Sequence, residues 1–304
     1  MLSKYNRLRQ GYEKINTMYR QNWLNIKTHI PYEKAYKYIQ NEGIVEEISY
    51  LSYFLESFKV VTYEQIRNYM KLGGFNIYNM NLEELVDYGF LNNFTISLEG
   101  AIEFNSNEIF YSIGANMSLF LRKYFESPVS RMLVRDISLS PAKLINRFNL
   151  VDFYLNYISS YGANSIINIE LNPRRRTTSD LINIDAELRV KNNGQEKHLI
   201  ILNVSADTVN TLLPKTITKL EKFLRWNNET EYKRINCENI ELVLLCENQE
   251  ILEYAAKKMV VTTFAKELKL NLLSIDYLLR IKLSEYNIAY SVDRLGNVIE
   301  KTFI

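Results

Sequence analysis

The chain has little cysteine, histidine, proline or glycine: its 304 residues include two Cys, two His, five Pro and ten Gly. Cys237 and Cys246 show no metal-ligand spacing, and two cysteines in a chain of this length give no disulfide framework. With only His29 and His198, histidine-rich metal sites and most histidine-based catalytic triads are disfavoured. These scarcities indicate a reducing cytosol and predict neither a bound metal nor another cofactor.

No apolar segment approaches the roughly 18 residues that a membrane-spanning helix needs. The apolar runs at 198–204 and 242–246 have the length of strands instead. The first residues alternate charged with apolar side chains and lack the apolar core of a signal peptide. We therefore expect a cytoplasmic protein without a membrane partner. Its 47% apolar and 24% charged content is that of a globular chain, and its length suits about two domains.

Charge is distributed unevenly along the chain, although the net charge is only +2. Residues 1–43 carry eight Lys and Arg against three Glu, a net +5, and residues 44–120 carry three against ten, a net −7. Residues 121–180 carry nine against five, a net +4, and residues 181–304 balance at seventeen each. Two basic segments flank an acidic one, so contacts with a polyanion are expected from the flanks.

Residues 1–43 form a basic, aromatic N-terminal arm, in which Lys4, Arg7 and Arg9 lie among tyrosines. Basic residues interleaved with aromatic residues suit an arm that follows a nucleic-acid backbone and stacks on its bases. The alternative is a helical extension whose aromatic residues pack on the rest of the protein and whose charges are solvated. The sequence leaves both interpretations open.

Residues 44–120 have the pattern of a winged helix-turn-helix domain. Apolar residues recur at helical spacing over 44–58. Thr62 and Gln65 then form a capping box that begins a second helix. A third helix ends near Gly89, and two β-like runs follow it. Three helices followed by a β-hairpin make the winged-helix plan.

The third helix of this plan is the one that normally reads DNA bases. Here it offers Asn79 and Asn81 to base edges, but Glu83, Glu84 and Asp87 repel phosphate. Winged helices also serve protein contact and dimerisation, and the net charge of −7 favours that use. DNA reading and protein contact, including formation of a homodimer, stay open for this domain.

Residues 121–148 are predicted to be a basic helical linker, with breaks at Pro128 and Pro141. A solvated helix face is one explanation of its charges. Contact with nucleic acid is the other.

Residues 149–304 are predicted to form a nuclease-like domain. A helix at about 141–160 is followed by strands at 164–171, 181–190 and 197–204, a helix at 208–226, a strand at 238–246, a helix at 249–267 and a strand at 270–275. Asn192-Asn193-Gly194 predicts a hairpin turn between the second and third strands. This αβββαβ order is that of the restriction-endonuclease-like, or PD-(D/E)XK, fold, so the predicted fold class is α+β or α/β.

In that fold, an Asp on the second strand and an acid-x-Lys motif on the third hold a divalent metal and position the attacking water. Asp185 stands at the first of these places, but Asn203 and Ser205 stand where the acid and the lysine are expected. We therefore interpret the three residues as vestiges of a site and expect no catalytic or metal-binding residue. An ordinary hydrogen-bonded role is favoured for Asp185, and a migrated metal site using Glu170 or Glu187 is the alternative.

The arrangement over about residues 44–280 resembles the replication-relaxation family of plasmid and mobile-element proteins. Members join an N-terminal winged helix to a nuclease-like domain with a Pro-Asp-Ala strand, a Glu-x-Asp strand, and a helix bearing a Lys and an aromatic residue. Asp185-Ala186, Asn203-Val204-Ser205, Lys219 and Phe223 stand at those places here, so the middle motif is degenerate. The resemblance implies a role in replication or transfer of a plasmid, phage or integrative element.

Two basic clusters in the C-terminal half favour contact with DNA. Arg174, Arg175 and Arg176 precede three hydroxyl residues between the first two strands, a composition that suits phosphate binding; solvated loop charge is the alternative. On the helix predicted at 208–226, four cations spaced by four, three and three residues share one face: Lys215, Lys219, Lys222 and Arg225.

The sequence therefore predicts a non-catalytic DNA-binding protein of a mobile element, acting in replication initiation or maintenance. DNA is the expected partner, together with replication or transfer proteins. One alternative is a protein adaptor or dimerisation module that uses the acidic winged helix. A second alternative is a metal-dependent nuclease with a migrated active site.

Overall fold

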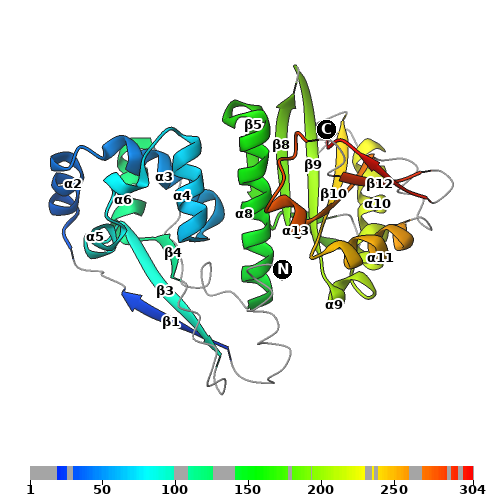
Figure 1. Cartoon of the computed structure of the whole chain (residues 1–304), viewed down its shortest axis with the longest axis horizontal. Helices are drawn as coiled ribbons and strands as arrows, with labels where there is room; N and C mark the ends of the chain where they lie inside the picture. The colour runs from blue at the N-terminus through cyan, green and yellow to red at the C-terminus, as the bar shows by residue number, and fades with distance from the viewer. Residues whose placement is uncertain are drawn as a thin grey trace. The chain divides into compact units, whose positions relative to one another are not determined.

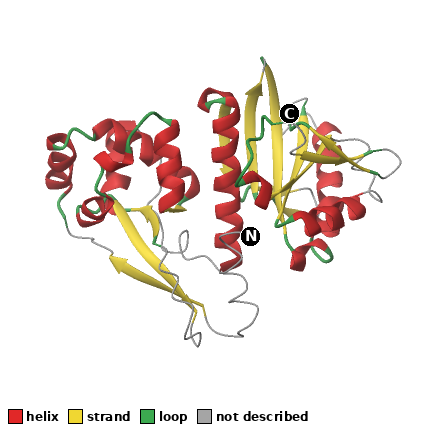
Figure 2. Ribbon diagram, viewed as in Figure 1, coloured by secondary structure: helices red, strands yellow, loops and turns green. Residues whose placement is uncertain are grey.

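The computed structural model describes residues 19–25, 30–98, 109–125, 141–176, 180–192, 194–229, 235, 239–259, 269–285, 289–293 and 297–303. The chain divides into two compact units, Met1–Val151 and Asp152–Ile304. Each unit combines helices with a sheet (Figure 1, Figure 2), which confirms the predicted mixture of α and β structure.

The first unit contains a four-stranded antiparallel sheet in the order β1-β3-β4-β2. β1 (Tyr19–Asn25) pairs with β3 (Leu91–Leu98), so part of the stretch predicted as an N-terminal arm is a strand of this sheet. β4 (Phe110–Ile113) lies between β3 and β2 (Val60–Thr62). The helices are α2 (Tyr32–Asn41), α3 (Val45–Phe58), α4 (Tyr63–Leu72), the 3-10 helix η1 (Ile77–Asn79), α5 (Leu82–Asp87) and α6 (Ala115–Phe125).

Helix α4 begins at the capping box that the sequence predicted. The Thr62 hydroxyl accepts a hydrogen bond from the Gln65 backbone N–H at 3.2 Å, and the Gln65 side-chain oxygen accepts one from the Thr62 backbone N–H at 3.1 Å. Each bond satisfies a donor that the start of a helix leaves without a partner. The Gln65 amide also donates to the Phe148 carbonyl at 3.1 Å, so the same residue joins α4 to α8 (Pro141–Tyr161).

Helix α8 begins in the first unit and continues into the second. In the first unit, the Phe148 ring stacks on Phe110 with centroids 5.2 Å apart. Arg147 is 8% exposed and donates to the Phe58 carbonyl at 3.0 Å. This cation of the predicted linker therefore belongs to the core of the unit and not to a solvated helix face. Residues 126–140, the middle of that linker, lie outside the described residues.

The second unit is organised around a seven-stranded mixed sheet in the order β13-β12-β11-β10-β9-β8-β5. The central strands β9, β10 and β11 are parallel, and the other neighbours are antiparallel. Two short strands, β6 (Arg174–Arg176) and β7 (Leu181–Asn183), pair with each other in a separate ribbon. The remaining strands are β5 (Ile166–Leu171), β8 (Ala186–Asn192), β9 (Gln195–Val204), β10 (Ile240–Cys246), β11 (Lys269–Ser274), β12 (Ala289–Val292) and β13 (Val298–Lys301).

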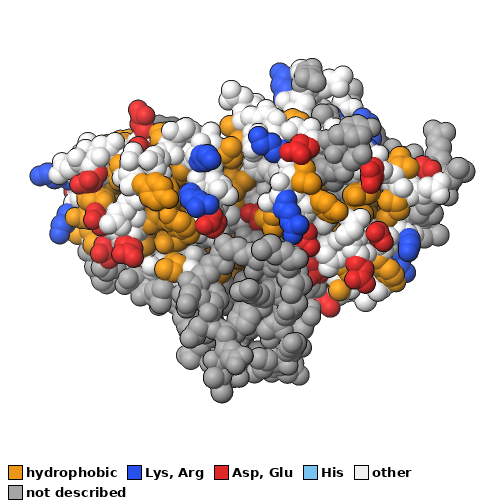
Figure 3. Space-filling model, viewed as in Figure 1, with side chains coloured by type: hydrophobic (Ala, Val, Ile, Leu, Met, Phe, Trp, Pro, Cys, Tyr) orange, Lys and Arg blue, Asp and Glu red, His pale blue; other side chains and the backbone are white. Residues whose placement is uncertain are grey.

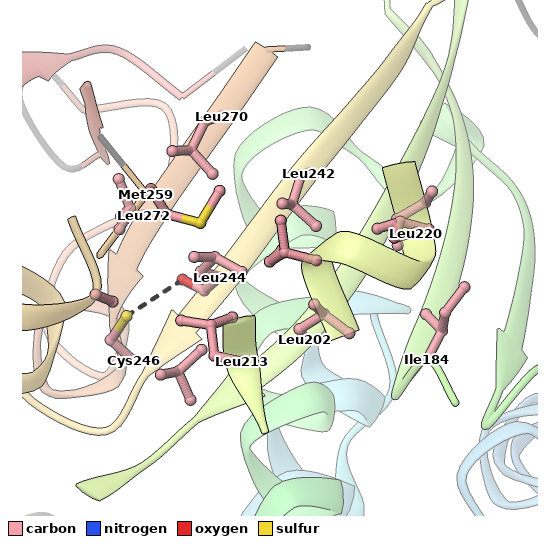
Figure 4. Packing of buried hydrophobic residues seen from close by; sticks show 14 of the residues in the cluster. Ile184, Leu202, Leu213, Leu220, Leu242, Leu244, Cys246, Met259, Leu270 and Leu272 are labelled. Carbon is pink, nitrogen blue, oxygen red and sulfur yellow. Dashed lines mark hydrogen bonds between the residues drawn. The ribbon is translucent and has the colours of Figure 1, made fainter. Parts of the chain in front are cut away.

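Helices cover both faces of this sheet (Figure 1). On one face lies the second half of α8, where the Asn156 amide donates to the carbonyls of Leu278 and Ile281, each at 2.7 Å. On the other face, α10 (Leu213–Glu229) and α11 (Gln249–Met259) pack on alternate residues of β9, β10 and β11. Figure 4 shows this apolar core, in which Leu220 from α10 lies over the sheet residues Leu202 and Leu242. The short helices of this unit are η2 (Ala163–Ser165), α9 (Ala206–Val209) and α13 (Ile275–Leu278).

Two predicted elements of this half are interrupted in the structure. The strand predicted at 181–190 is divided between β7 and β8, because β7 pairs with β6 and not with β9. The helix predicted at 208–226 is divided between α9 and α10. Pro214 lies in the first turn of α10, where its missing N–H is tolerated, whereas a continuous helix from α9 needs that donor.

Candidate nucleic-acid interface

The β6–β7 ribbon has one outward and one inward face. Arg174 pairs with Asn183, and Arg176 pairs with Leu181. All four side chains are exposed. Because side chains alternate along a strand, Arg175 and its partner Ile182 turn inward. Ile182 is 1% exposed and belongs to the apolar core beneath α10.

Inward-facing Arg175 is held by two carboxylates. Its Nε lies 2.9 Å from Glu187 Oε1, and its Nη2 lies 2.9 Å from Glu170 Oε2. His198 Nε2 lies 3.1 Å from the other oxygen of Glu187. Burial acts to raise the pKa of Glu187, but the hydrogen bonds from His198 and Arg175 outweigh it and hold that pKa below its ordinary value. Arg175 therefore stabilises the fold, and the prediction that all three consecutive arginines present free charge needs correction at this residue.

The contacts of Arg175 involve Glu170 and Glu187, the two carboxylates considered as ligands of a migrated metal site. Both carboxylates are bonded to the Arg175 guanidinium. Among the described residues, no group of three or more His, Cys, Asp or Glu side chains is arranged to hold a metal ion.

Helix α10 lies beside the ribbon and presents the predicted basic face. Its apolar face is buried in the core, whereas Lys215, Lys222 and Arg225 are exposed. Lys219 is half-buried, and its ammonium donates to the Leu181 carbonyl of β7 at 3.4 Å. Lys222 Nζ lies 4.0 Å from Asp180 Oδ2, an exposed and therefore weak pair. The structure thus places Lys219 and Lys222 of α10 next to the ribbon that carries Arg174 and Arg176.

Asp185, Asn203 and Ser205, which the sequence analysis interpreted as vestiges of a site, lie where β8 begins and β9 ends. Asp185 Oδ2 accepts a hydrogen bond from the Asn203 backbone N–H at 2.7 Å, and burial raises the pKa of Asp185. The side-chain amide atoms of Asn203 are buried without a hydrogen-bond partner. Ser205 precedes α9, and its backbone N–H donates to the Thr208 hydroxyl at 2.8 Å. Of these three side chains only Asp185 can carry the negative charge that a metal ion needs.

No protein-family model, curated protein or solved structure matches this chain. In the described part of the chain, no helix is both long and apolar enough to cross a membrane.

Helix α5 is the third helix of the predicted winged-helix plan, for which DNA reading and protein contact were both left open, and its exposed side chains are mostly acidic. Asn81 caps its own helix, since its side-chain oxygen accepts from the backbone N–H groups of Glu83 at 3.1 Å and Glu84 at 3.3 Å. Glu84 also accepts a hydrogen bond of 2.6 Å from the Tyr38 hydroxyl. Exposed Glu83, Glu84 and Asp87 leave this helix with an acidic surface. Asn79, just before the helix, is exposed.

Part of the predicted site cannot be placed, and part of the observed one was not predicted. Lys4, Arg7 and Arg9 of the N-terminal arm lie outside the described residues. Leu181 and Asn183 join the outward face of the ribbon, although the sequence analysis did not single them out. The sequence provided little indication of these two residues, because three consecutive arginines predicted a loop and not a strand that pairs with residues 181–183.

Proposed function

We propose that this chain is a non-catalytic DNA-binding protein, with its main phosphate-binding surface in the second unit. The observation that carries the proposal is the contact between α10, which bears exposed Lys215, Lys222 and Arg225, and strand β7 of the ribbon, whose outward face bears Arg174 and Arg176. No described carboxylate pairs with either outward arginine of the ribbon. Exposed guanidinium and ammonium groups on neighbouring elements suit the phosphates of a nucleic-acid backbone.

The order of elements in the second unit supports a nuclease-like ancestry for this surface. Helix α8, strands β5, β8 and β9, helix α10 and strand β10 follow one another in the αβββαβ order of the PD-(D/E)XK fold. Asp185, just before β8, accepts a hydrogen bond from the backbone of Asn203 on the neighbouring strand β9, an arrangement that suits the first Asp and the motif acid of that fold. With Asn and Ser in place of the acid and the lysine, a divalent metal and its attacking water lack their usual ligands, so we propose binding without cleavage.

The first unit and the family resemblance extend the proposal to a biological setting. Three helices, α3, α4 and α5, precede the antiparallel pair β3 and β4, an order that supports a winged helix. Together with the resemblance to the replication-relaxation family, this favours a role in replication initiation or maintenance of a plasmid, phage or other mobile element.

Fluorescence anisotropy with a labelled duplex and the full chain tests the proposal. The logarithm of the affinity should fall linearly with the logarithm of the salt concentration, and Lys215→Ala/Lys222→Ala should flatten that slope by about 1.8 at about 0.9 per contact. The matched control is Lys257→Ala/Lys258→Ala, which removes the same charge from α11. An equal slope change in both variants, or no DNA binding by the unaltered chain at low salt, contradicts the proposal.

A second function, protein contact through the first unit, is favoured by exposed aromatic side chains. Tyr53 is 47% exposed and Tyr124 is 49% exposed, and each contacts a neighbouring aromatic ring. On the face drawn in Figure 3, hydrophobic side chains gather over the helices of this unit. Sedimentation of the full chain tests this use: a dimer that Tyr53→Ser/Tyr124→Ser dissociates supports it, and a monomer at all concentrations argues against a homodimer.

A further inference from the structure

We infer that the outward face of the β6–β7 ribbon reads base edges in the major groove of duplex DNA. The inference depends on the proposed DNA binding and adds to it a division of labour. The cations of α10 contact phosphates without regard to sequence, and Arg174, Arg176, Leu181 and Asn183 supply the sequence preference.

The size of the ribbon fits the groove. Paired strands lie about 4.8 Å apart, and residues two apart on a strand lie about 7 Å apart, so the four outward side chains form a compact rectangle. The major groove of B-form DNA is about 12 Å wide and about 8.5 Å deep and admits a two-stranded ribbon. The residue pairs Arg174–Asn183 and Arg176–Leu181 lie on the same face of the ribbon, because residues directly opposite each other on paired strands point to one side. A reading face requires this arrangement.

The outward set has the chemistry that distinguishes base pairs. An arginine guanidinium donates two hydrogen bonds to the O6 and N7 atoms of guanine, and an asparagine amide pairs with N6 and N7 of adenine. An apolar side chain such as Leu181, 46% exposed here, contacts the methyl group of thymine. The ribbon thus combines two guanine readers, one adenine reader and one methyl contact. A surface that only bound phosphate would have no use for the leucine.

The ribbon is fixed from its inner side, which is what precise reading needs. Arg175 is bonded to Glu187 and Glu170, and Ile182 is buried in the core. At the base of the ribbon, the Asn172 backbone N–H donates to the Asp185 carbonyl at 2.9 Å. These attachments hold the outward side chains on a rigid element, so little freedom is lost when they meet the bases.

The experiment is selection of bound duplexes from a pool with a short randomised segment, using the full chain at about 150 mM salt. The expected result is an enriched motif containing guanines next to an A·T pair. The decisive variant is Arg174→Lys/Arg176→Lys, which keeps both charges but removes the bidentate forks. It should retain the salt dependence of binding and lose at least about tenfold in preference for the motif over scrambled DNA.

The matched variant is Lys215→Ala/Lys222→Ala on α10. It should weaken binding to motif and scrambled DNA alike and leave the selected motif unchanged. Circular dichroism and thermal melting should be unaltered in both variants, because all four side chains are exposed.

The outcomes separate the inference from the proposed function. Binding without any enriched motif, or a motif that the arginine-to-lysine variant retains, overturns the reading face while leaving the DNA-binding proposal in place. Absence of binding to every duplex overturns both. Loss of the motif in the α10 variant alone contradicts the division of labour and moves base reading to the helix.

Discussion

Helices α5 and α10 make an instructive comparison, because each buries one face in its own unit and presents the other to solvent. α5 bears Glu83, Glu84 and Asp87 on its exposed side, and its one well-placed amide is used to cap the helix. α10 bears lysines and an arginine there, beside a ribbon with two further cations. The apolar pattern that makes each helix fold is similar. The sign of the charge on the solvent side decides which of them suits a phosphate backbone.

The inward and outward faces of the β6–β7 ribbon differ in a similar way. Arg175 and its neighbours Arg174 and Arg176 are the same residue type, but strand alternation turns them to opposite faces. The inward guanidinium is bonded to carboxylates, and the outward ones have no described carboxylate partner. Charge turned inward therefore contributes to stability, and charge turned outward is available to a ligand.

The largest expected effect breaks the inward contact. Glu187→Ala leaves the Arg175 guanidinium without its most buried partner, and loss of one member of a buried ion pair costs about 3 kcal/mol. Arg174→Ala should change the free energy of unfolding by less than about 0.5 kcal/mol, because its side chain is exposed. Urea unfolding of the full chain measures both. Similar costs for the two variants contradict the assignment of separate roles to the two faces.

The comparison of the two helices is sharpened by neutralising each. Lys215→Ala/Lys222→Ala/Arg225→Ala should flatten the salt dependence of DNA binding by about 2.7 and weaken binding about a hundredfold near 150 mM salt. Glu83→Gln/Glu84→Gln/Asp87→Gln should leave the slope unchanged or strengthen binding slightly through the loss of repulsion. Anisotropy titrations at several salt concentrations give both slopes. A large loss of DNA affinity when α5 is neutralised would indicate that DNA binds to α5 and not to α10.

The pH dependence of stability should differ between two carboxylates that lie two residues apart. The pKa of Glu187 is lowered in the fold, so its stabilising contribution is present above its unfolded pKa and is lost as the pH falls through the folded value. The pKa of Asp185 is raised, so its charge destabilises the fold above the folded pKa and has no effect below the unfolded one.

Glu187→Gln should therefore lower stability at pH 7 and lose this effect in acid. Asp185→Asn should raise stability at pH 7 by up to about 1 kcal/mol, again with no difference in acid, because it removes a buried charge. Chemical unfolding of the unaltered chain and of both variants, at pH 7 and near pH 3, measures the change in the free energy of unfolding for each variant at each pH. A destabilising Asp185→Asn at pH 7 would show that the ionised carboxylate is needed where it lies.

Local signals in the sequence predicted much of this fold. The Thr62 capping box is confirmed, and so is the antiparallel pairing of β8 with β9, in which Asn192 pairs with Gln195, because each is determined by neighbouring residues. Pairings over a distance in sequence were not predictable in the same way. β1 pairs with β3 more than 60 residues later, and β12 and β13 complete the sheet from the C-terminal end.

The candidate site shows the same limit. Periodicity placed Lys215, Lys219, Lys222 and Arg225 on one helix face, and the structure agrees. The periodicity of the sequence did not predict the contact between Arg175 and Glu187, because that contact depends on the pairing of β6 with β7. Asp185, Asn203 and Ser205 were singled out because they stand at the motif positions of the PD-(D/E)XK fold, and the structure adds a hydrogen bond from the Asn203 backbone N–H to the Asp185 carboxylate.

The central claim, binding without cleavage, is tested most directly by incubating the full chain with supercoiled DNA in Mg²⁺ or Mn²⁺ and separating the products on a gel after the protein is removed. A parallel sample run with its protein should show a shifted band, which establishes that the DNA is bound. We expect the recovered DNA to be intact, since Asp185 alone does not hold a metal ion and activate a metal-bound water. Nicked or linear product that disappears with a chelator and with Asp185→Ala would contradict this expectation.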